Sequence, residues 1–419
     1  MMMKLPSVAM SALAPAPASA SPAPAPPGSP PDTLAPGGRV DALTGLRFLA
    51  ALAVFAHHFT GLGGPGSGVA RVPAFFPYTT MGVHGVGFFF VLSGFLLAWG
   101  YRPGTSARLF YWRRAGRIWP AHLAASLLAL VLLFWWGGRA TDAFSVLASV
   151  LLVQTWFPGV TPTLPGNSVA WTLSVELFFY ALFPLLVRGA LALRTRTLLA
   201  VSAGSLAVMA AVNLWLLTHL SGAAAEWVMR HPLARLPEFG LGLAAALALR
   251  RGVRPALRAW PVVVALAAYT VAYTRRAEWA GEGAVVLEAT VRPVVAVLAV
   301  GLVVACVVRA TAGTRGEGWL ASPVMVRLGL WSYAFYLLHQ TLNYAITDRW
   351  GHQPAGGVAL FTMIGTAVVA TALAGALYHG LEEPARRWWA ARPPRWVTGG
   401  GDLWRVRALF LPHRSGGPS

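Results

Sequence analysis

The sequence is poor in charge and in cysteine. Of its 419 residues, 56% are hydrophobic and only 11% are charged, against roughly 45–50% and 25% in an ordinary soluble domain. This composition excludes an ordinary soluble fold. Cys306 is the only cysteine, so no disulfide can form within the chain, and no Cys/His spacing typical of zinc sites occurs. We expect neither a structural metal nor a bound cofactor.

Acidic residues are also scarce, which leaves a strongly basic balance. The formal net charge is +19, from 33 Lys and Arg against 14 Asp and Glu. In membrane proteins Lys and Arg accumulate in cytoplasmic loops, so this balance indicates topology rather than nucleic-acid binding. We expect the lipid bilayer as a partner, and no nucleic acid.

The two ends of the sequence lack long hydrophobic runs. Residues 1–38 are dominated by Pro and Ala, and repeated Pro prevents an apolar helix, so we predict a disordered or polyproline-like tail rather than a signal peptide. Residues 385–419 carry seven Arg among Pro and Gly and are predicted to form a basic, disordered tail that touches anionic lipid. Residues 39–384 are predicted to form one membrane domain.

Eleven apolar segments follow one another between the tails. They cover approximately 43–61, 82–101, 119–137, 143–157, 171–187, 198–218, 233–249, 259–274, 283–308, 328–346 and 356–380. The segment 143–157 has about 15 residues, fewer than the ~17–25 that a crossing requires, and it runs into the Pro/Gly-rich stretch PGVTPTLPG. It is predicted to be re-entrant or interfacial.

The distribution of basic residues supports ten crossings. If the N-terminus is cytoplasmic and 143–157 does not cross, 24 Lys and Arg lie on the cytoplasmic side of the membrane and six on the outer side. A crossing at 143–157 would move the basic loop 188–196 to the outer side, against the usual excess of Lys and Arg in cytoplasmic loops. The sequence therefore predicts an all-α, polytopic integral-membrane helical bundle of about ten transmembrane helices plus a short re-entrant segment. Both termini are expected in the cytoplasm, and the protein in the plasma membrane.

The first span contains the leading catalytic candidates. Arg47 and His58 are eleven positions apart, which places them within about 20° of one helix face and ~16 Å apart along the axis. Arg47 is expected near the cytoplasmic entrance and His58 near the bilayer centre, with His57 pointing about 80° away. Because an ionisable group inside the bilayer is costly, we predict a catalytic role for His58. The alternative is a histidine hydrogen-bonded between helices.

A second histidine, His339, is expected at the same depth as His58. Ser332, Tyr333 and Tyr336 share its helix. These side chains either hydrogen-bond to a buried substrate or pack between helices.

Glu176 and Glu288 are acidic residues within apolar spans. Glu176 is flanked by apolar residues, so it either pairs with an Arg such as Arg235 or orients a histidine or substrate. Glu288 and Arg292 are one turn apart and are predicted to pair with each other.

The segment SARLFYWRRAGRIWPAH concentrates Arg113, Arg114 and Arg117 beside aromatic residues. Guanidinium groups bind phosphates through paired hydrogen bonds. The segment is therefore either a topology signal or the site of a phosphorylated ligand at the cytoplasmic face.

Seven ordered motifs resemble those of the acyltransferase-3 family, integral-membrane enzymes that transfer acyl groups to hydroxyls of sugars, glycans and secondary metabolites. The resemblance covers roughly residues 41–387. The motifs are TGLRFLAALAVFAHHF, with the family's pattern of Arg, ten residues and His; GVGFFFVLSGFLLAW; FYWRRAGRIWP; WTLSVELFFYALFP; RLPEFGLG; LGLWSYAFYLLHQ; and LEEPARR. Each motif alone is weak evidence, but their shared order is strong evidence.

The resemblance implies transfer of an acyl group from an acyl-CoA donor to a hydroxyl of a sugar, glycan or macrolide-type acceptor. Its catalytic residues would be His58, as general base or as a transient acyl carrier, with Arg47 and Glu176. The substrate-binding residues would be Arg113, Arg114 and Arg117 at the coenzyme A phosphates, together with Ser93, Arg235, Tyr333 and His339.

The sequence departs from the family pattern at two positions. Gly87 stands where many members have an acidic residue, and His122 replaces a common aromatic residue. If the acidic residue assists the histidine elsewhere in the family, another carboxylate such as Glu176 would have to do so here. The variants GLRFLAALAV and RLPEFGLG resemble the actinobacterial branch that includes macrolide acyltransferases.

Two other classes are compatible with intramembrane His, Glu and Arg. A transporter or flippase would use them for proton coupling, but it predicts two repeated halves, and the sequence contains no such repeat. A membrane glycosyltransferase is expected to carry acidic residues in a large outer loop, and the predicted outer loops have few.

Overall fold

The computed structural model describes residues 38–61, 68–70, 76–160, 166–220, 222–312 and 318–398. Within these ranges the chain is helical, and an isolated bridge between Ala70 and Gln353 is the only β-type pairing. Nearly all of the predicted N-terminal tail lies outside the described residues.

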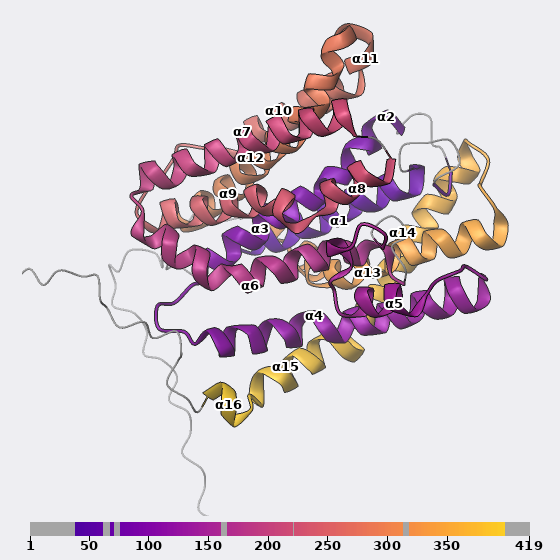
Figure 1. The fold of residues 1–419 in the computed structure, drawn as a ribbon, viewed down its shortest axis with the longest axis horizontal. Coiled ribbons are helices and arrows are strands. Elements are labelled where there is room, and N and C mark those ends of the chain that lie inside the picture. The colour runs from indigo at the N-terminus through magenta and orange to yellow at the C-terminus, as the bar shows by residue number, and fades with distance from the viewer. Residues whose placement is uncertain are drawn as a thin grey trace, which may run out of the picture.

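Ten long helices lie side by side and roughly along one direction (Figure 1). They are α1 (Asp41–Thr60), α3 (Gly85–Trp99), α4 (Ala107–Ala129), α6 (Trp171–Ala192), α7 (Thr195–His219), α9 (Pro232–Arg250), α10 (Ala259–Thr274), α12 (Ala284–Thr311), α13 (Pro323–Trp350) and α14 (Gly357–Leu377).

Short helices connect or extend the long ones. They are α2 (Phe76–Thr79), η1 (Thr80–His84), η2 (Leu130–Trp136), α5 (Ala143–Val150), η3 (Gln154–Trp156), η4 (Ser168–Ala170), α8 (Gly222–Arg230), α11 (Arg276–Trp279), η5 (Gly281–Gly283), η6 (Trp319–Ala321), η7 (Tyr378–Glu382), α15 (Glu383–Ala391) and α16 (Arg395–Thr398).

Local sequence signals explain where several helices begin. Ser106 caps α4 by accepting a hydrogen bond from the Leu109 amide (3.5 Å), and Ser322 caps α13 in the same way, followed directly by Pro323. Side-chain oxygens at this position satisfy an amide that has no partner within the helix, and proline suits the first helical turn.

The fold is a polytopic helical membrane bundle, as the sequence predicted. Eight helical stretches of the described chain are long and apolar enough to cross a membrane. These stretches are 41–60, 80–99, 107–136, 168–192, 195–219, 222–250, 284–311 and 357–391. The 16-residue α10 and the 28-residue α13 run beside them.

The segment around α5 does not cross, which agrees with the predicted re-entrant segment. With eight residues α5 is only about 12 Å long. Its last residue, Val150, places its carbonyl oxygen 3.3 Å from Nε2 of His122, which lies in the middle of α4. The segment after α5 also contacts α6, because the hydroxyl of Thr155 in η3 lies 2.6 Å from that of Ser174 in α6.

Glycines allow the closest helix contacts. A Cβ atom at Gly242 of α9 would lie 1.9 Å from the backbone oxygen of Val91 in α3, and one at Gly94 would lie 2.0 Å from that of Phe239. Gly329 of α13 approaches Thr44 of α1 equally closely. Small residues are typical of such interfaces in membranes, where close backbone approach provides the packing.

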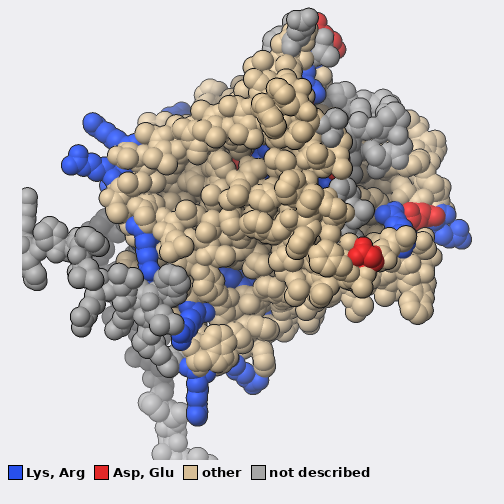
Figure 2. All heavy atoms as spheres, in the orientation of Figure 1, with Lys and Arg blue, Asp and Glu red and all other residues tan. Residues whose placement is uncertain are grey.

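One end of the bundle, here called the arginine-rich end, collects basic residues from several helices. Nη1 of Arg250 donates to the carbonyls of Ala98 (2.8 Å) and Tyr101 (2.7 Å), and Nη2 of Arg251 donates to that of Ala190 (3.0 Å). The ends of α3, α6 and α9 therefore meet there. Figure 2 shows basic side chains projecting from this end, while the middle of the visible face carries almost none.

Two expectations from the sequence are wrong. Glu288 does not pair with Arg292, because Glu288 lies 2.5 Å from Arg276 of the neighbouring hairpin, whereas Arg292 points inward and donates to Asn213 (3.0 Å). The predicted irregular tail also begins too early: α15 continues the chain as a helix to Ala391. Residues 399–419 of that tail lie outside the described residues.

Candidate active site

A deep cavity brings together side chains from five helices, with an empty volume of about 840 Å³. Eight residues singled out in the sequence line it: Arg47, Ser93, Arg114, Arg117, Glu176, Ser332, Tyr333 and Tyr336. The cavity wall runs along α3 from Val86 to Leu97, a length of about 16 Å.

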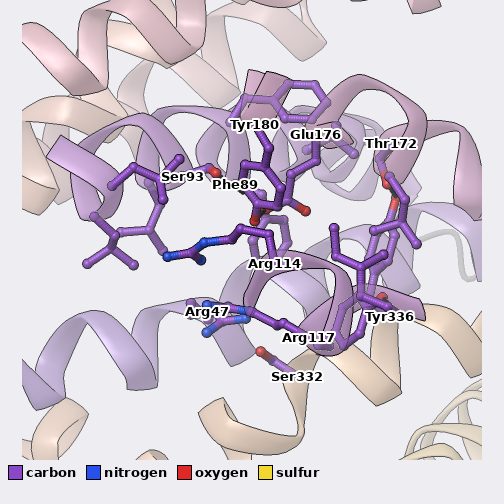
Figure 3. Close-up of a pocket in the computed structure, with 18 residues that line it drawn as sticks. Arg47, Phe89, Ser93, Arg114, Arg117, Thr172, Glu176, Tyr180, Ser332 and Tyr336 are labelled. Atoms are coloured by element: carbon purple, nitrogen blue, oxygen red, sulfur yellow. Dashed lines mark hydrogen bonds between the residues drawn. The ribbon is translucent and has the colours of Figure 1, made fainter. Parts of the chain in front are cut away.

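Three arginines extend into this cavity from α1 and α4 (Figure 3). The guanidinium of Arg114 lies 5.4 Å from the ring centroid of Phe110 and 5.3 Å from that of Tyr180. Among the described residues, the guanidiniums of Arg47 and Arg117 form no hydrogen bond or ion pair, although the carboxylates of Glu176 and Glu382 are close enough to attract both. Because buried cations are normally paired, this arrangement fits an anionic ligand.

Glu176 faces the arginines from α6. Its Oε1 atom accepts hydrogen bonds from Ser93 (3.3 Å) and from Tyr180. Arg235, its suggested partner, pairs with Glu238 instead. Glu176 is therefore held by hydroxyl groups at the cavity wall.

A second cavity adjoins the first and shares Leu96, Leu97 and Arg114 with it. It has an empty volume of about 1070 Å³ and lies at the arginine-rich end. Its basic lining residues are Arg102, Arg113, Arg114 and Arg188. The two cavities together form a basic passage from this end into the bundle, with Arg113 at its mouth and Arg117 inside.

His58 and His339 meet each other beyond the inner end of this passage. Nδ1 of His58 lies 2.8 Å from Nε2 of His339, and the rings stack with centroids 5.1 Å apart. His58 was expected near the bilayer centre, at the depth of His339; in the structure it lies in the last turn of α1, which ends at Thr60. His339, by contrast, lies in the interior of α13 and is fully buried.

Two aromatic rings separate the passage from the histidines. Phe89 and Tyr336 line the cavity, and their rings meet edge to face with centroids 6.0 Å apart. The Tyr336 ring lies 5.6 Å from that of His339 on the next turn of α13. His57 is buried on a different side of α1, against Gly82 of η1.

Arg235 lies apart from the passage, in a buried charge cluster. It is 3.4 Å from Glu238, and Nε of Arg292 is 3.9 Å from the same carboxylate oxygen. A Cβ atom at Gly87 would lie only 2.9 Å from Oε1 of Glu238. The carboxylate beside Gly87 is thus Glu238 of α9, and not Glu176.

Tyr333 and Ser332 line the cavity but are already hydrogen-bonded to the backbone. The Tyr333 hydroxyl donates to the carbonyl of Ile118 (3.0 Å), and that of Ser332 donates to Gly329 (2.7 Å). The Tyr333 contact ties α13 to α4, whereas the Ser332 contact stays within α13.

Reasoning from the sequence gave no role to Tyr180 or Glu238. Tyr180 follows Glu176 by one turn, so the i, i+4 spacing could have indicated a contact. Glu238 meets Gly87 from a different helix, and no spacing within one segment predicts such a contact.

The site can bind an anion, hold a carboxylate in place and offer a partly buried imidazole pair. Among the described residues no three His, Cys, Asp or Glu are grouped as metal ligands. The arrangement fits proton transfer at His58 with a phosphorylated ligand in the passage.

Comparison with known proteins gives a family match over most of the chain. The family model described as an acyltransferase domain matches residues 40–379. "Acyltransferase MdmB" of Streptomyces mycarofaciens is 34% identical over 396 residues, covering 85% of this chain and 94% of that protein. "Nodulation protein 10" of Rhizobium leguminosarum bv. viciae is 31% identical over 119 residues, covering 25% of this chain and 32% of that protein. No solved structure matches. The chain belongs to the acyltransferase-3 family and is a multi-pass membrane acyltransferase.

Proposed function

We propose that this acyltransferase moves an acyl group from acyl-CoA to a hydroxyl of an acceptor, and that the base is His58. The observation that carries the proposal is the basic passage, in which Arg47 and Arg117 have no hydrogen-bond or ion-pair partner among the described residues. The acceptor oxygen attacks the thioester carbonyl, the C–S bond breaks, and the proton passes through His58 to the departing thiolate.

The donor occupies the passage with its phosphates at the arginine-rich end. Arg113 and Arg188 line the mouth, and Arg114 lines both cavities. Guanidinium groups suit phosphates because their fork of donors matches two oxygens at once. The smaller inner cavity then holds the arm of coenzyme A that carries the acyl group. The thioester at the end of this arm reaches His58 when the rings of Phe89 and Tyr336 rotate away.

His339 orients His58. When Nδ1–H of His58 donates to Nε2 of His339, Nε2 of His58 keeps its lone pair for the acceptor hydroxyl. Arg47 stabilises negative charge in the passage. Ser93 and Tyr333 line the cavity that receives the acceptor hydroxyl and the oxyanion. Arg235 supports this cavity from the neighbouring charge cluster with Glu238.

We place both termini and the arginine-rich end at the cytoplasmic face of the plasma membrane, because basic residues favour that side. His58 lies in the last turn of α1, away from that end, so the acceptor enters from the opposite face. Among sugar, glycan and macrolide acceptors, we favour a macrolide-type acceptor. The actinobacterial style of the motifs and the alignment over 94% of a Streptomyces acyltransferase support this choice.

Membership of an acyltransferase family argues against the transporter alternative. The deciding experiment incubates the purified protein with acetyl-CoA and a panel of macrolide and sugar alcohols, and follows free thiol release and product mass. We expect acyl ester and thiol in equal amounts. Solute flux that depends on His58, without ester formation on any alcohol, would favour the transporter.

A further inference from the structure

The last helices of the described chain extend beyond the membrane core. Residues 357–391 form a helical stretch of 35 residues, about 52 Å long at 1.5 Å per residue. The hydrocarbon core is only ~30 Å thick. Because this stretch is longer than the hydrocarbon core is thick, and α15 lies at its end beside the arginine-rich half of α4 (Figure 1), we expect α15 at the level of the lipid headgroups.

One face of α15 and α16 is fixed to α4. The indole N–H of Trp112 donates to the carbonyl of Trp389 (2.9 Å), and their rings lie 4.6 Å apart. Trp389 also covers Gly116, where a Cβ atom would lie 2.3 Å from its ring. Arg108 donates to the carbonyl of Trp396 (3.1 Å), which secures α16 to the same helix.

The opposite face of this segment is exposed, aromatic and basic. Trp388 and Trp396 are 52% and 62% exposed. The Arg387 side chain is 75% exposed, and Arg392 lies 5.3 Å from the Trp388 ring centroid. Tryptophan favours the membrane interface, and exposed arginines there attract anionic headgroups. Arg386 forms a two-pronged ion pair with Glu383, and Nε of Arg387 donates to the same carboxylate (2.6 Å), so one carboxylate faces two arginines and the segment keeps an excess of positive charge.

The contacted helix α4 also carries the donor passage. Arg113, Arg114 and Arg117 line the cavities, while Trp112 and Gly116, on another face of α4, contact α15. The contact with α15 and the cavity arginines therefore share one rigid helix, through which a shift at Gly116 can reach the arginines.

We propose that Trp388, Trp396, Arg387 and Arg392 form a binding surface for anionic phospholipid, and that its occupation raises donor affinity through the contact of Trp389 with Gly116. The proposed lipid-binding surface does not depend on the proposed function. The proposed effect of bound lipid on donor affinity rests on the donor site proposed above.

The surface is tested with the full-length protein in nanodiscs of phosphatidylcholine with phosphatidylglycerol, by native mass spectrometry of retained lipid. Arg387→Gln with Arg392→Gln leaves the Arg386–Glu383 pair intact and should lower retention about tenfold. The matched control is Arg196→Gln with Arg258→Gln, which removes two exposed arginines at the same end, away from α4. Equal lipid retention in the two double variants would show that Arg387 and Arg392 do not form a lipid-binding surface.

The coupling is tested by the affinity for coenzyme A, measured in nanodiscs with and without phosphatidylglycerol. The wild type should bind about fivefold more tightly with the anionic lipid. Gly116→Ala should retain the lipid but lose this dependence, because the added methyl separates α15 from α4. Equal affinity in both discs, or an unchanged dependence in Gly116→Ala, would overturn the coupling. Because lipid retention is measured without any acyl transfer, a failure of the lipid-binding proposal can be distinguished from a failure of the proposed acyltransferase mechanism.

Discussion

Nδ1 of His58 lies 2.8 Å from Nε2 of His339, although 281 positions separate the two residues in the sequence. The planes of the two rings differ by only 10°. This contact joins the last turn of α1 to the interior of α13, and under the proposed mechanism Nε2 of His58 is the atom that meets the acceptor hydroxyl.

Replacing His58 should abolish acyl transfer, whereas replacing its neighbour should not. His58→Ala removes the proposed base, which typically costs ~10²–10⁴ in rate. His57→Ala changes a residue that packs toward η1 and should keep much of the activity. Initial rates in membranes with matched protein levels decide the question. Near-wild-type turnover in His58→Ala would show that the mechanism is wrong.

His339 should act on kcat and not on donor KM. His339→Ala removes the acceptor for Nδ1–H of His58, and we expect kcat to fall about 10- to 100-fold, the loss of one hydrogen bond to a group that becomes charged. His339→Gln offers an oxygen in place of Nε2 and should restore part of the rate. If both variants lower activity equally and lower thermal stability in parallel, His339 is structural.

The basic passage should control donor affinity. Arg113→Ala and Arg114→Ala should each weaken coenzyme A binding about 10-fold or more, the worth of a charge-assisted hydrogen bond, with little effect on acceptor KM. Arg196→Ala is the control, because it is exposed at the same end outside both cavities. Unchanged coenzyme A affinity in both test variants would show that the arginines of SARLFYWRRAGRIWPAH serve only as a topology signal.

The orientation of the bundle can be tested by cysteine labelling. Cys306 is buried, so background labelling should be low. Thr197→Cys, exposed near the loop 188–196, should react with a membrane-impermeant maleimide only after permeabilisation, while Thr141→Cys at the opposite end should react in intact cells. Labelling of Thr197→Cys from outside would contradict the proposed topology.

The contact between α3 and α9 should not tolerate a methyl group. Gly242→Ala places a Cβ atom 1.9 Å from the backbone of Val91, and such overpacking typically costs ~1–3 kcal/mol of folding free energy. Gly240→Ala, on the same helix with no atom within 4 Å of its Cβ, should be neutral or stabilising. Thermal unfolding of the two purified variants checks the difference, and equal melting temperatures would show that the helices separate without cost.

Much of the fold follows from local sequence. Apolar runs set the helices because the bilayer leaves backbone groups no partner except one another. The re-entrant segment was predictable because 143–157 is too short to cross. The cavity arginines were also predictable, since Arg113, Arg114 and Arg117 lie in one segment rich in charge and aromatic rings.

Contacts between helices were decided by the tertiary structure alone. The sequence could place His58 and His339 only at similar depth, and it assigned Arg292 to Glu288 because they are one turn apart. In the structure, Arg292 turns to Asn213 of α7, and Glu238 of α9 fills the space beside Gly87 of α3. Periodicity fixes the face of a helix on which a side chain lies, but the rotation and neighbours of that helix depend on packing over the whole bundle. The sequence by itself therefore determined which polar residues lie within the apolar helices, and the packing of the helices decided which of them meet.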